Sequence, residues 1–363
     1  MQKPEIKPLT GVRAFASWWV VLFHLRGIIA DLLLTPRSGL VSVLAGGNFG
    51  VDLFFVLSGF VLAYNYHDAF PVLTGRLYGR FLWQRLARIY PIHCLGLAIW
   101  GMFLVANSFL KHKQAIAGNF SGKALVAQIF LVQAWSIPDV FSWNYPAWSI
   151  SMEWMAYLGF PFLIRYIIRR RSSIAIPAIA VCVLGLGAPF LMNLPAEHFV
   201  RIISEFASGC LLYMLFARGF GQRFLSSWVA PISFLVAVGF GYRIGHFVMP
   251  VFIVLIYALL FDRGAAAAVF GSGWCMYGGR VSYSLYMVHA PVISACHYLL
   301  PINRFLDSPD AVKMAVFGAY VAAIAISGVL AYHYVELPCR RQMLRGNWLG
   351  QRTRRPAARE ACS

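Results

Sequence analysis

Long apolar segments, separated by short polar ones, follow one another along almost the whole chain. Ten of them approach the length of about 20 residues that a helix needs to cross the hydrocarbon core of a bilayer. Their approximate ranges are 11–33, 48–66, 89–110, 146–168, 172–192, 199–217, 226–243, 246–262, 281–301 and 311–335. The pattern predicts an all-α fold, a polytopic transmembrane helical bundle of about ten spans.

The first apolar segment is predicted to remain in the membrane as a span. It is too long for the apolar core of a signal peptide, and it contains Arg13, His24, Arg26 and Asp31. The apolar segment 124–136 is different, because its length falls short of about 20 residues. We predict that it is an interfacial or re-entrant part of a loop, and the sequence leaves open which of the two.

Composition supports a membrane protein. Hydrophobic residues make up 60% of the 363 positions and charged residues 12%, about half the charged fraction of a soluble domain. The net charge of +18 comes from basic residues between the apolar segments and near the C-terminus. This placement is typical of loops facing anionic lipid and argues against nucleic-acid binding.

The basic residues also predict the orientation. If the N-terminus is cytoplasmic, nearly every basic cluster faces the cytoplasm, at 76–88, 169–171, 218–223 and 340–355, with Lys111 and Lys113 as a small exception among the clusters. We therefore predict two cytoplasmic termini, a membrane core over 1–338 and a basic cytoplasmic tail over 339–363. The expected location is a bacterial inner membrane.

Ionisable residues at membrane depth are costly and usually serve a function. His24 lies 11 residues after Arg13, about 16 Å further along a helix and close to the same face. Glu153 enters from the opposite side and reaches a similar depth, with Ser149 one turn before it. We predict that Glu153 orients His24 as a general base; a structural His–Glu hydrogen bond is the alternative.

Four arginines lie between the second and third predicted spans, at Arg76, Arg80, Arg85 and Arg88. Arginine forms bidentate contacts with phosphate, so this loop could hold a phosphorylated ligand at the cytoplasmic side. From spacing alone, an ordinary basic cytoplasmic loop is an equal alternative.

Other polar residues give weaker signals. Asp52 is expected to cap the second span, and Arg201 and Glu205 are spaced as an ion pair on one helix face. His289 lies about 12 Å from the cytoplasmic face, and Glu336 is expected to contact basic residues at the end of the last span. The seven cysteines lack paired or metal-type spacing, so no disulfide framework and no metal site are expected.

Six motifs occur in order along the chain. They are LTGVRAFA (9–16), GNFGVDLFFVLSGF (47–60), RLARIYP (85–91), AWSISME (147–153), SYSLYMVHAP (282–291) and VELP (335–338). Together they resemble the membrane acyltransferase 3 family, whose members O-acylate sugars and other hydroxyl acceptors with acyl-CoA. The resemblance implies a ten-span core, an essential histidine at His24, and functional arginines at Arg13, Arg85 and Arg88.

The sequence and the resemblance together predict an integral membrane O-acyltransferase. It would move an acyl group, acetyl in the first instance, from cytoplasmic acyl-CoA to a hydroxyl of a surface glycan, lipid-linked sugar or secreted small molecule. Acyl-CoA is expected as co-substrate, with no permanently bound cofactor. A transporter or flippase of a glycan precursor is the alternative. The predicted catalytic residues are His24, Glu153 and Arg13, and the sequence leaves open whether His24 is a general base or carries the acyl group transiently itself. The predicted substrate-binding residues are Arg76, Arg80, Arg85, Arg88, Asp52, Trp148, Ser149 and His289.

Overall fold

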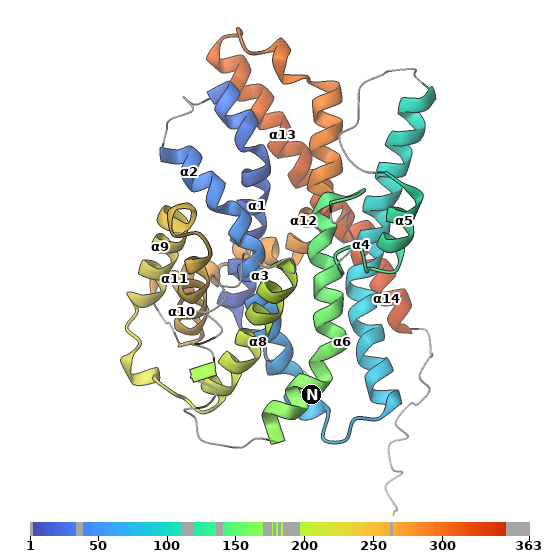
Figure 1. The fold of residues 1–363 in the computed structure, drawn as a ribbon. Helices are drawn as coiled ribbons and strands as arrows, with labels where there is room; N and C mark the ends of the chain where they lie inside the picture. Colours follow the sequence, from blue (N-terminus) through green and yellow to red (C-terminus); the bar gives the residue numbers. More distant parts are fainter. Residues whose placement is uncertain are drawn as a thin grey trace, which may run out of the picture.

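The computed structural model describes residues 3–33, 39–109, 120–135, 141–169, 197–261 and 264–345, together with positions 176, 179, 180 and 183. Within these residues the secondary structure is helical, without strands. The long helices run roughly side by side, as Figure 1 shows. They are α1 (Lys7–Leu33), α3 (Gly50–Tyr66), α4 (Gly75–Phe109), α6 (Trp148–Arg169), α8 (Glu197–Ala217), α12 (Gly273–Leu299) and α13 (Asp310–Ala331).

Shorter helices connect and flank the long ones. They are α2 (Gly39–Ala45), α5 (Gly122–Ile129), α9 (Val229–Ile244), α10 (Val248–Phe261), α11 (Ala265–Phe270) and α14 (Leu337–Arg345). The all-α fold is thus as predicted for the part of the chain that the structure describes.

Seven helical segments are long and apolar enough to cross a membrane, among the residues that the structure describes. They are Lys7–Leu33, Gly39–Ala69, Gly75–Asn107, Phe199–Ala217, Val229–Phe261, Gly273–Arg304 and Asp310–Arg345. The protein is therefore an integral membrane protein, but the count of ten spans is not confirmed. The fourth predicted span forms α6, which is not among the seven, and most of the fifth, 172–192, lies outside the described residues.

The seventh and eighth predicted spans form a helical hairpin. Helices α9 and α10 have 16 and 14 residues, or about 24 and 21 Å at 1.5 Å per residue. They pack against each other, and Gly245 between them has φ +57°, a conformation that glycine adopts without steric cost. Each helix alone is shorter than the roughly 30 Å of a hydrocarbon core.

The arginines of the predicted cytoplasmic loop lie on a helix. Helix α4 continues for 35 residues from Gly75, through Pro91, to Phe109. The third predicted span began at residue 89, so the arginine segment is a rigid extension of that span. Because the helix is continuous, Arg85 and Arg88 have a defined direction toward the bundle.

The segment 124–136 does not form a spanning helix. Helix α5 has eight residues, and the chain turns after it at Leu131, which has φ 58°. Ala124, Ala127 and Gln128 are buried, whereas Val126 and Phe130 are exposed. The segment is therefore a short helix packed on the bundle by one face.

Two close helix crossings set the geometry of the bundle. Where α3 crosses α8, a Cβ atom on Gly59 would lie 2.0 Å from the Phe206 carbonyl oxygen, and one on Gly209 would lie 2.1 Å from that of Val56. Where α1 crosses α12, a Cβ atom on Gly279 would lie 1.9 Å from the Thr10 carbonyl oxygen. Small residues allow backbones to approach closely in membrane bundles.

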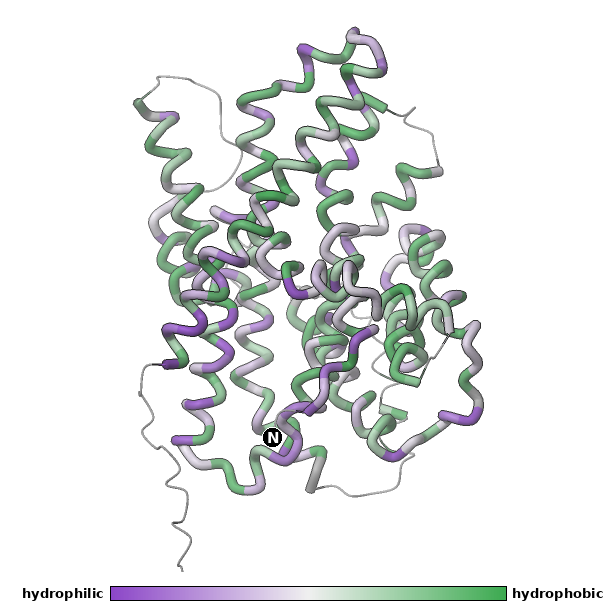
Figure 2. The backbone as a smooth tube through the Cα atoms, turned by 180° about the vertical axis from the view of Figure 1, so that it is seen from behind, coloured by the Kyte–Doolittle hydropathy of each residue, from purple (hydrophilic) through white to green (hydrophobic). Residues whose placement is uncertain are grey.

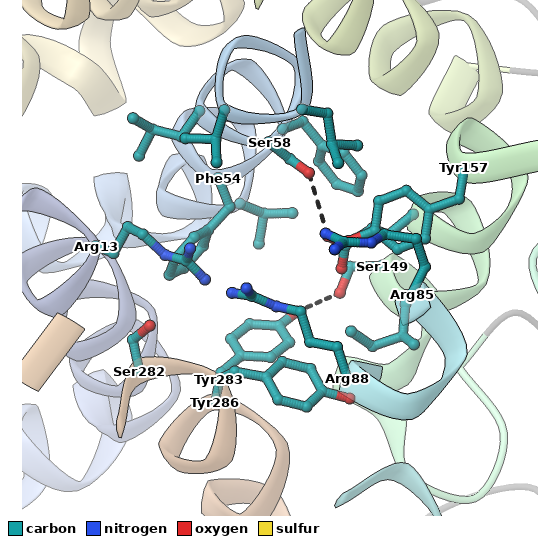
Figure 3. Close-up of a pocket in the computed structure, with 17 residues that line it drawn as sticks. Arg13, Phe54, Ser58, Arg85, Arg88, Ser149, Tyr157, Ser282, Tyr283 and Tyr286 are labelled. Atoms are coloured by element: carbon teal, nitrogen blue, oxygen red, sulfur yellow. Dashed lines mark hydrogen bonds between the residues drawn. The ribbon is translucent and has the colours of Figure 1, made fainter. Parts of the chain in front are cut away.

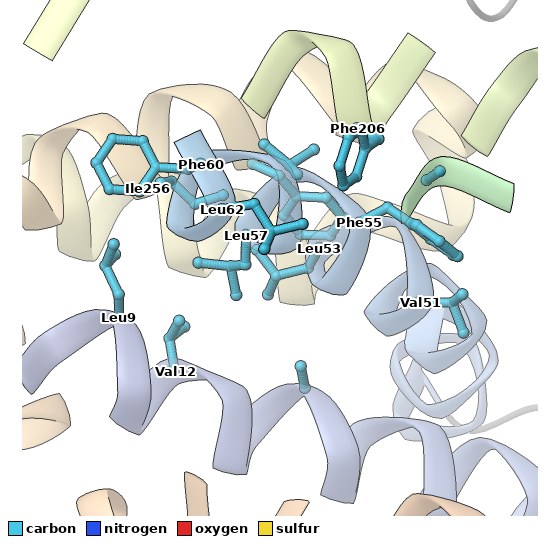
Figure 4. Close-up of a cluster of buried hydrophobic side chains, with 14 of the residues drawn as sticks. Leu9, Val12, Val51, Leu53, Phe55, Leu57, Phe60, Leu62, Phe206 and Ile256 are labelled. Carbon is cyan, nitrogen blue, oxygen red and sulfur yellow. The ribbon is translucent and has the colours of Figure 1, made fainter. Parts of the chain in front are cut away.

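The apolar core surrounds α3. Figure 4 shows Leu57 of α3 in the middle of this cluster, with Phe206 of α8 on one side and Leu9 and Val12 of α1 on the other. This packing holds α1, α3 and α8 in fixed rotations, so the polar residues on these helices have fixed directions as well.

Hydrophilic positions are concentrated toward the end of the bundle where the N-terminus lies, as Figure 2 shows. The predicted tail begins inside the fold, because α14 runs from Leu337 to Arg345 and the Trp83 indole N–H of α4 donates to the Met343 carbonyl at 3.0 Å. The predicted boundary between core and tail therefore falls within a helix. Residues 346–363 lie outside the described residues.

Candidate functional site

A cavity of about 730 Å³, part of it open to solvent, lies between α1, α3, α4, α6 and α12. Its polar lining includes Arg13, Arg85, Arg88, Glu153 and Ser149, which the sequence singles out from three separate motifs. Ser58, Tyr157, Ser282, Tyr283 and Tyr286 complete the polar lining. The fold thus gathers residues from distant parts of the chain around one space.

The cavity is rich in positive charge. Figure 3 shows Arg13 of α1 and Arg88 of α4 pointing toward each other across the space. The Arg13 Nε atom is buried without a hydrogen-bond partner among the described residues. Arg85 donates to the Tyr66 hydroxyl at 2.9 Å and lies over the rings of Tyr66 and Phe81. Guanidinium groups that face each other favour an anion between them.

Glu153 is the only carboxylate among the described residues that line the cavity. It accepts a hydrogen bond from the Ser58 hydroxyl at 3.3 Å and another from Tyr157, one helical turn further along α6. The predicted pairing with His24 is not observed: in the described residues, no hydrogen bond joins the two side chains. Similar depth in the membrane did not imply contact, because Glu153 faces α3 and α4 while His24 faces α12.

His24 is paired with a second histidine. Its Nδ1 atom lies 2.9 Å from the Val20 carbonyl oxygen and 3.2 Å from Nε2 of His289. The His289 Nδ1 atom lies 2.5 Å from the Tyr286 carbonyl oxygen. His24 is half-buried and His289 is fully buried. Neither residue lines the arginine cavity, but Tyr286, one turn before His289 on α12, does.

A strained loop brings a third ring to this pair. The ring centroid of Tyr145 lies 5.1 Å from that of His24 and 6.2 Å from that of His289. Two residues earlier, Trp143 has φ 54°, a left-handed conformation that costs about 1–3 kcal/mol outside glycine. Hydrogen bonds from the Trp143 indole to the Ser121 carbonyl and from Asn144 to the Met287 carbonyl hold the loop in place.

Ser149 connects the cavity to the same loop. Its hydroxyl lies 2.9 Å from that of Tyr286, which also donates to the Pro146 carbonyl oxygen at 3.0 Å. Ser149 therefore already has partners within the protein. Arg76 and Arg80 are exposed on α4 and do not line the cavity, so the four predicted arginines divide into an exposed pair and a pair in the site.

Asp52 belongs to a separate buried cluster, which the half-buried Trp148 adjoins. The Arg201 Nε atom lies 3.2 Å from the Asp52 carboxylate and 3.6 Å from that of Glu205, and its guanidinium lies 5.8 Å from the centre of the Trp148 ring. The prediction that Asp52 caps its helix is wrong, because Asp52 is buried and bound to α8. The predicted Arg201–Glu205 pair is confirmed, and Asp52 is the third member of the cluster.

Glu336 turns into the bundle. It lies in the π-helical segment Tyr332–Glu336, is buried, and accepts a hydrogen bond from the Ser284 hydroxyl at 2.6 Å. Its carboxylate interacts electrostatically with Arg88 and Arg340. Around the cavity, the three guanidinium groups of Arg13, Arg85 and Arg88 therefore outnumber the carboxylates of Glu153 and Glu336.

Sequence reasoning missed five hydroxyl-bearing residues of the site: Ser58, Tyr157, Ser282, Tyr283 and Tyr286. One signal could have revealed two of them. Tyr283, Tyr286 and His289 follow one another at intervals of three residues, which places them along one face of a helix. Inside an apolar segment, such a polar stripe indicates a wet or functional face.

Comparison with known proteins identifies the protein family. The acyltransferase 3 family model, described as an acyltransferase domain, matches residues 6–332. The chain is 29% identical to the acyltransferase MdmB of Streptomyces mycarofaciens, over 93% of this chain and 92% of that protein. It is 24% identical to the putative O-acetyltransferase SACOL0978 and 22% identical to the O-acetyltransferase OatA, both of Staphylococcus aureus.

Each of these staphylococcal matches covers 94% of this chain but less than three fifths of the relative, 59% and 58% respectively. No solved structure matches the chain significantly. Because the family model covers most of the sequence, including the arginine cavity and the histidine pair, the chain belongs to the membrane acyltransferase 3 family.

Proposed function

We propose that this protein transfers an acetyl group from acetyl-CoA to a hydroxyl of a sugar or another cell-surface or secreted acceptor. Family membership supports acyl transfer over the alternative of a transporter or flippase. The names of the staphylococcal relatives support acetyl as the group and oxygen as the acceptor atom. The observation that supports acetyl-CoA as the donor is the arginine cavity.

The cavity matches the polar part of acyl-CoA in charge. Arg13, Arg85 and Arg88 come from two helices, and they present guanidinium groups that suit phosphate oxygens. The exposed arginines Arg76 and Arg80 precede them on α4 and attract the anion toward the cavity from the cytoplasm. This role assumes the orientation that the basic residues predict, with both termini cytoplasmic.

His24 is the proposed general base. It lies 11 residues beyond Arg13 on α1, about 16 Å along the helix, a distance that the extended pantetheine arm can cover. His24 takes the proton of the acceptor hydroxyl as its oxygen attacks the thioester carbonyl. The tetrahedral intermediate then loses CoA thiolate as the C–S bond breaks. The proton passes from His24 to the sulfur, so acetyl ester and CoA thiol are the products.

The test is an acetyl-transfer assay with purified protein in nanodiscs. Acetyl-CoA labelled in the acetyl group is supplied with glycan and small-molecule acceptors, and both free CoA thiol and labelled ester are measured. We expect equal amounts of the two products, and loss of at least about a hundredfold in turnover for His24→Ala.

His93→Ala is the matched control, because His93 is also a buried histidine in the bundle but contacts the Gln128 carbonyl, away from the cavity lining. Wild-type turnover in a folded His24→Ala protein would refute the catalytic role of His24. Movement of a glycan precursor across the nanodisc or vesicle membrane without CoA release would favour the flippase alternative.

A further inference from the structure

We infer that His289 is a positioning residue: it holds His24 in the one tautomer that can act as a base toward the substrate. This inference rests on the proposed function and assigns His289 a role other than the substrate contact that the sequence predicts.

The tautomer of His289 follows from its hydrogen bonds. Its Nδ1 atom faces the Tyr286 carbonyl oxygen at 2.5 Å. A carbonyl oxygen can only accept, so Nδ1 carries a hydrogen and donates. In a neutral imidazole the other nitrogen, Nε2, then has a lone pair and can only accept. The buried position of His289, with 0% of its surface exposed, favours this neutral form.

The tautomer of His24 follows from that of His289. Its Nδ1 atom faces two groups that can only accept, the Val20 carbonyl oxygen at 2.9 Å and the His289 Nε2 lone pair at 3.2 Å. The hydrogen of His24 therefore lies on Nδ1 and is shared between them. The reverse tautomer would place a lone pair of His24 against the Val20 oxygen and a lone pair of His289 against the Tyr286 oxygen.

The consequence is that Nε2 of His24 carries the free lone pair. A general base needs an unprotonated nitrogen directed at the substrate, with its other N–H anchored. When Nε2 takes the acceptor proton, the cationic ring forms, and the Val20 oxygen and His289 Nε2 stabilise its Nδ1–H. His289 thus occupies the place that a carboxylate holds in a Ser–His–Asp triad, without adding a charge inside the membrane.

Two substitutions of His289 test its hydrogen bond to His24 separately from its hydrogen bond to the Tyr286 carbonyl. His289→Asn keeps an amide that can donate to the Tyr286 carbonyl but is too short to reach His24. His289→Gln places an amide oxygen near the former Nε2 position, where it can accept from His24. We expect His289→Asn to lower kcat about 10- to 100-fold with the KM for acetyl-CoA unchanged, and His289→Gln to remain within about fivefold of wild type.

The assay is the nanodisc reaction described above, with thermal unfolding midpoints measured in parallel for each variant. A His289→Asn protein with wild-type kcat would overturn the inference, and so would a His289→Gln protein as inactive as His289→Asn. A raised KM with unchanged kcat would also overturn it, because it would indicate a substrate contact. Should His24→Ala retain turnover, the proposed function itself fails, which is a separate and distinguishable result.

Discussion

Arg201 and the cavity arginines of this bundle differ in how their charge is balanced. Between α3 and α8, Arg201 lies within ion-pair distance of two carboxylates, those of Asp52 and Glu205. Around the cavity, Arg13, Arg85 and Arg88 share Glu153 as the only lining carboxylate of the described residues. The positive charge of Arg201 is balanced within the protein, whereas the cavity arginines leave positive charge for a ligand.

The difference separates structural from functional charge. A buried ion group that is paired internally costs stability when one partner is removed. A group of like charges around an open space destabilises the empty protein slightly and gains free energy when an anion enters. Arginine therefore has two roles in one bundle. Substitution of Arg201 should lower stability, whereas substitution of the cavity arginines should lower ligand affinity.

The largest effect is expected for Arg201→Ala. Two buried carboxylates would lose their cation, which should destabilise the fold by about 3–5 kcal/mol and lower the yield of folded protein. Size-exclusion chromatography and the thermal midpoint in detergent measure this. Arg76→Ala, which removes an exposed arginine, is the control. A folded Arg201→Ala protein with an unchanged midpoint would show that the ion cluster is not structural.

Neutral replacement of the whole cluster should reverse most of that loss. The triple variant Asp52→Asn, Arg201→Gln and Glu205→Gln leaves no uncompensated charge, and such replacements of buried ion groups are often close to neutral in stability. We expect a folded yield near that of wild type in the same measurements. A triple variant as unstable as Arg201→Ala would mean that the guanidinium contacts, rather than charge balance, stabilise the α3–α8 interface.

At the cavity, the expected loss is in binding. The double variant Arg85→Ala and Arg88→Ala should fold, yet its affinity for CoA should fall about 100-fold, or roughly 2.7 kcal/mol. Ligand binding raises the thermal midpoint, so CoA should stabilise the wild type strongly and the double variant little. Arg76→Ala and Arg80→Ala together form the matched control on the exposed part of α4. A full CoA-induced shift in the cavity variant would place donor binding elsewhere.

The smallest effect is expected for Glu153→Gln. Its amide oxygen can still accept hydrogen bonds from Ser58 and Tyr157, but the negative charge in the cavity is removed. Phosphate binding should therefore tighten, with the Kd of CoA falling about threefold, or roughly 0.6 kcal/mol. Titration calorimetry at low ionic strength measures the change. A weaker affinity for CoA in this variant would argue against a cavity that selects anions by charge.

The charged residues that line the cavity were predictable from the sequence, but their contacts were not. Arg13, Arg85, Arg88, Glu153 and Ser149 were all singled out by their positions in apolar segments and motifs, and all line one cavity. The predicted pairing of His24 with Glu153 was not observed, because depth along a helix says nothing about the direction in which a side chain points. Asp52 was assigned to a helix cap for the same reason, while its partner lay on α8.

The sequence by itself determined the helical class, the membrane location and the approximate ends of most long helices. These follow from the length of apolar segments and from the cost of polar groups in hydrocarbon, which are local properties. Only the tertiary structure decided which polar side chains meet. His24 and His289 are 265 residues apart, and they meet because α1 and α12 cross closely at Gly279, which fixes the rotation of each helix.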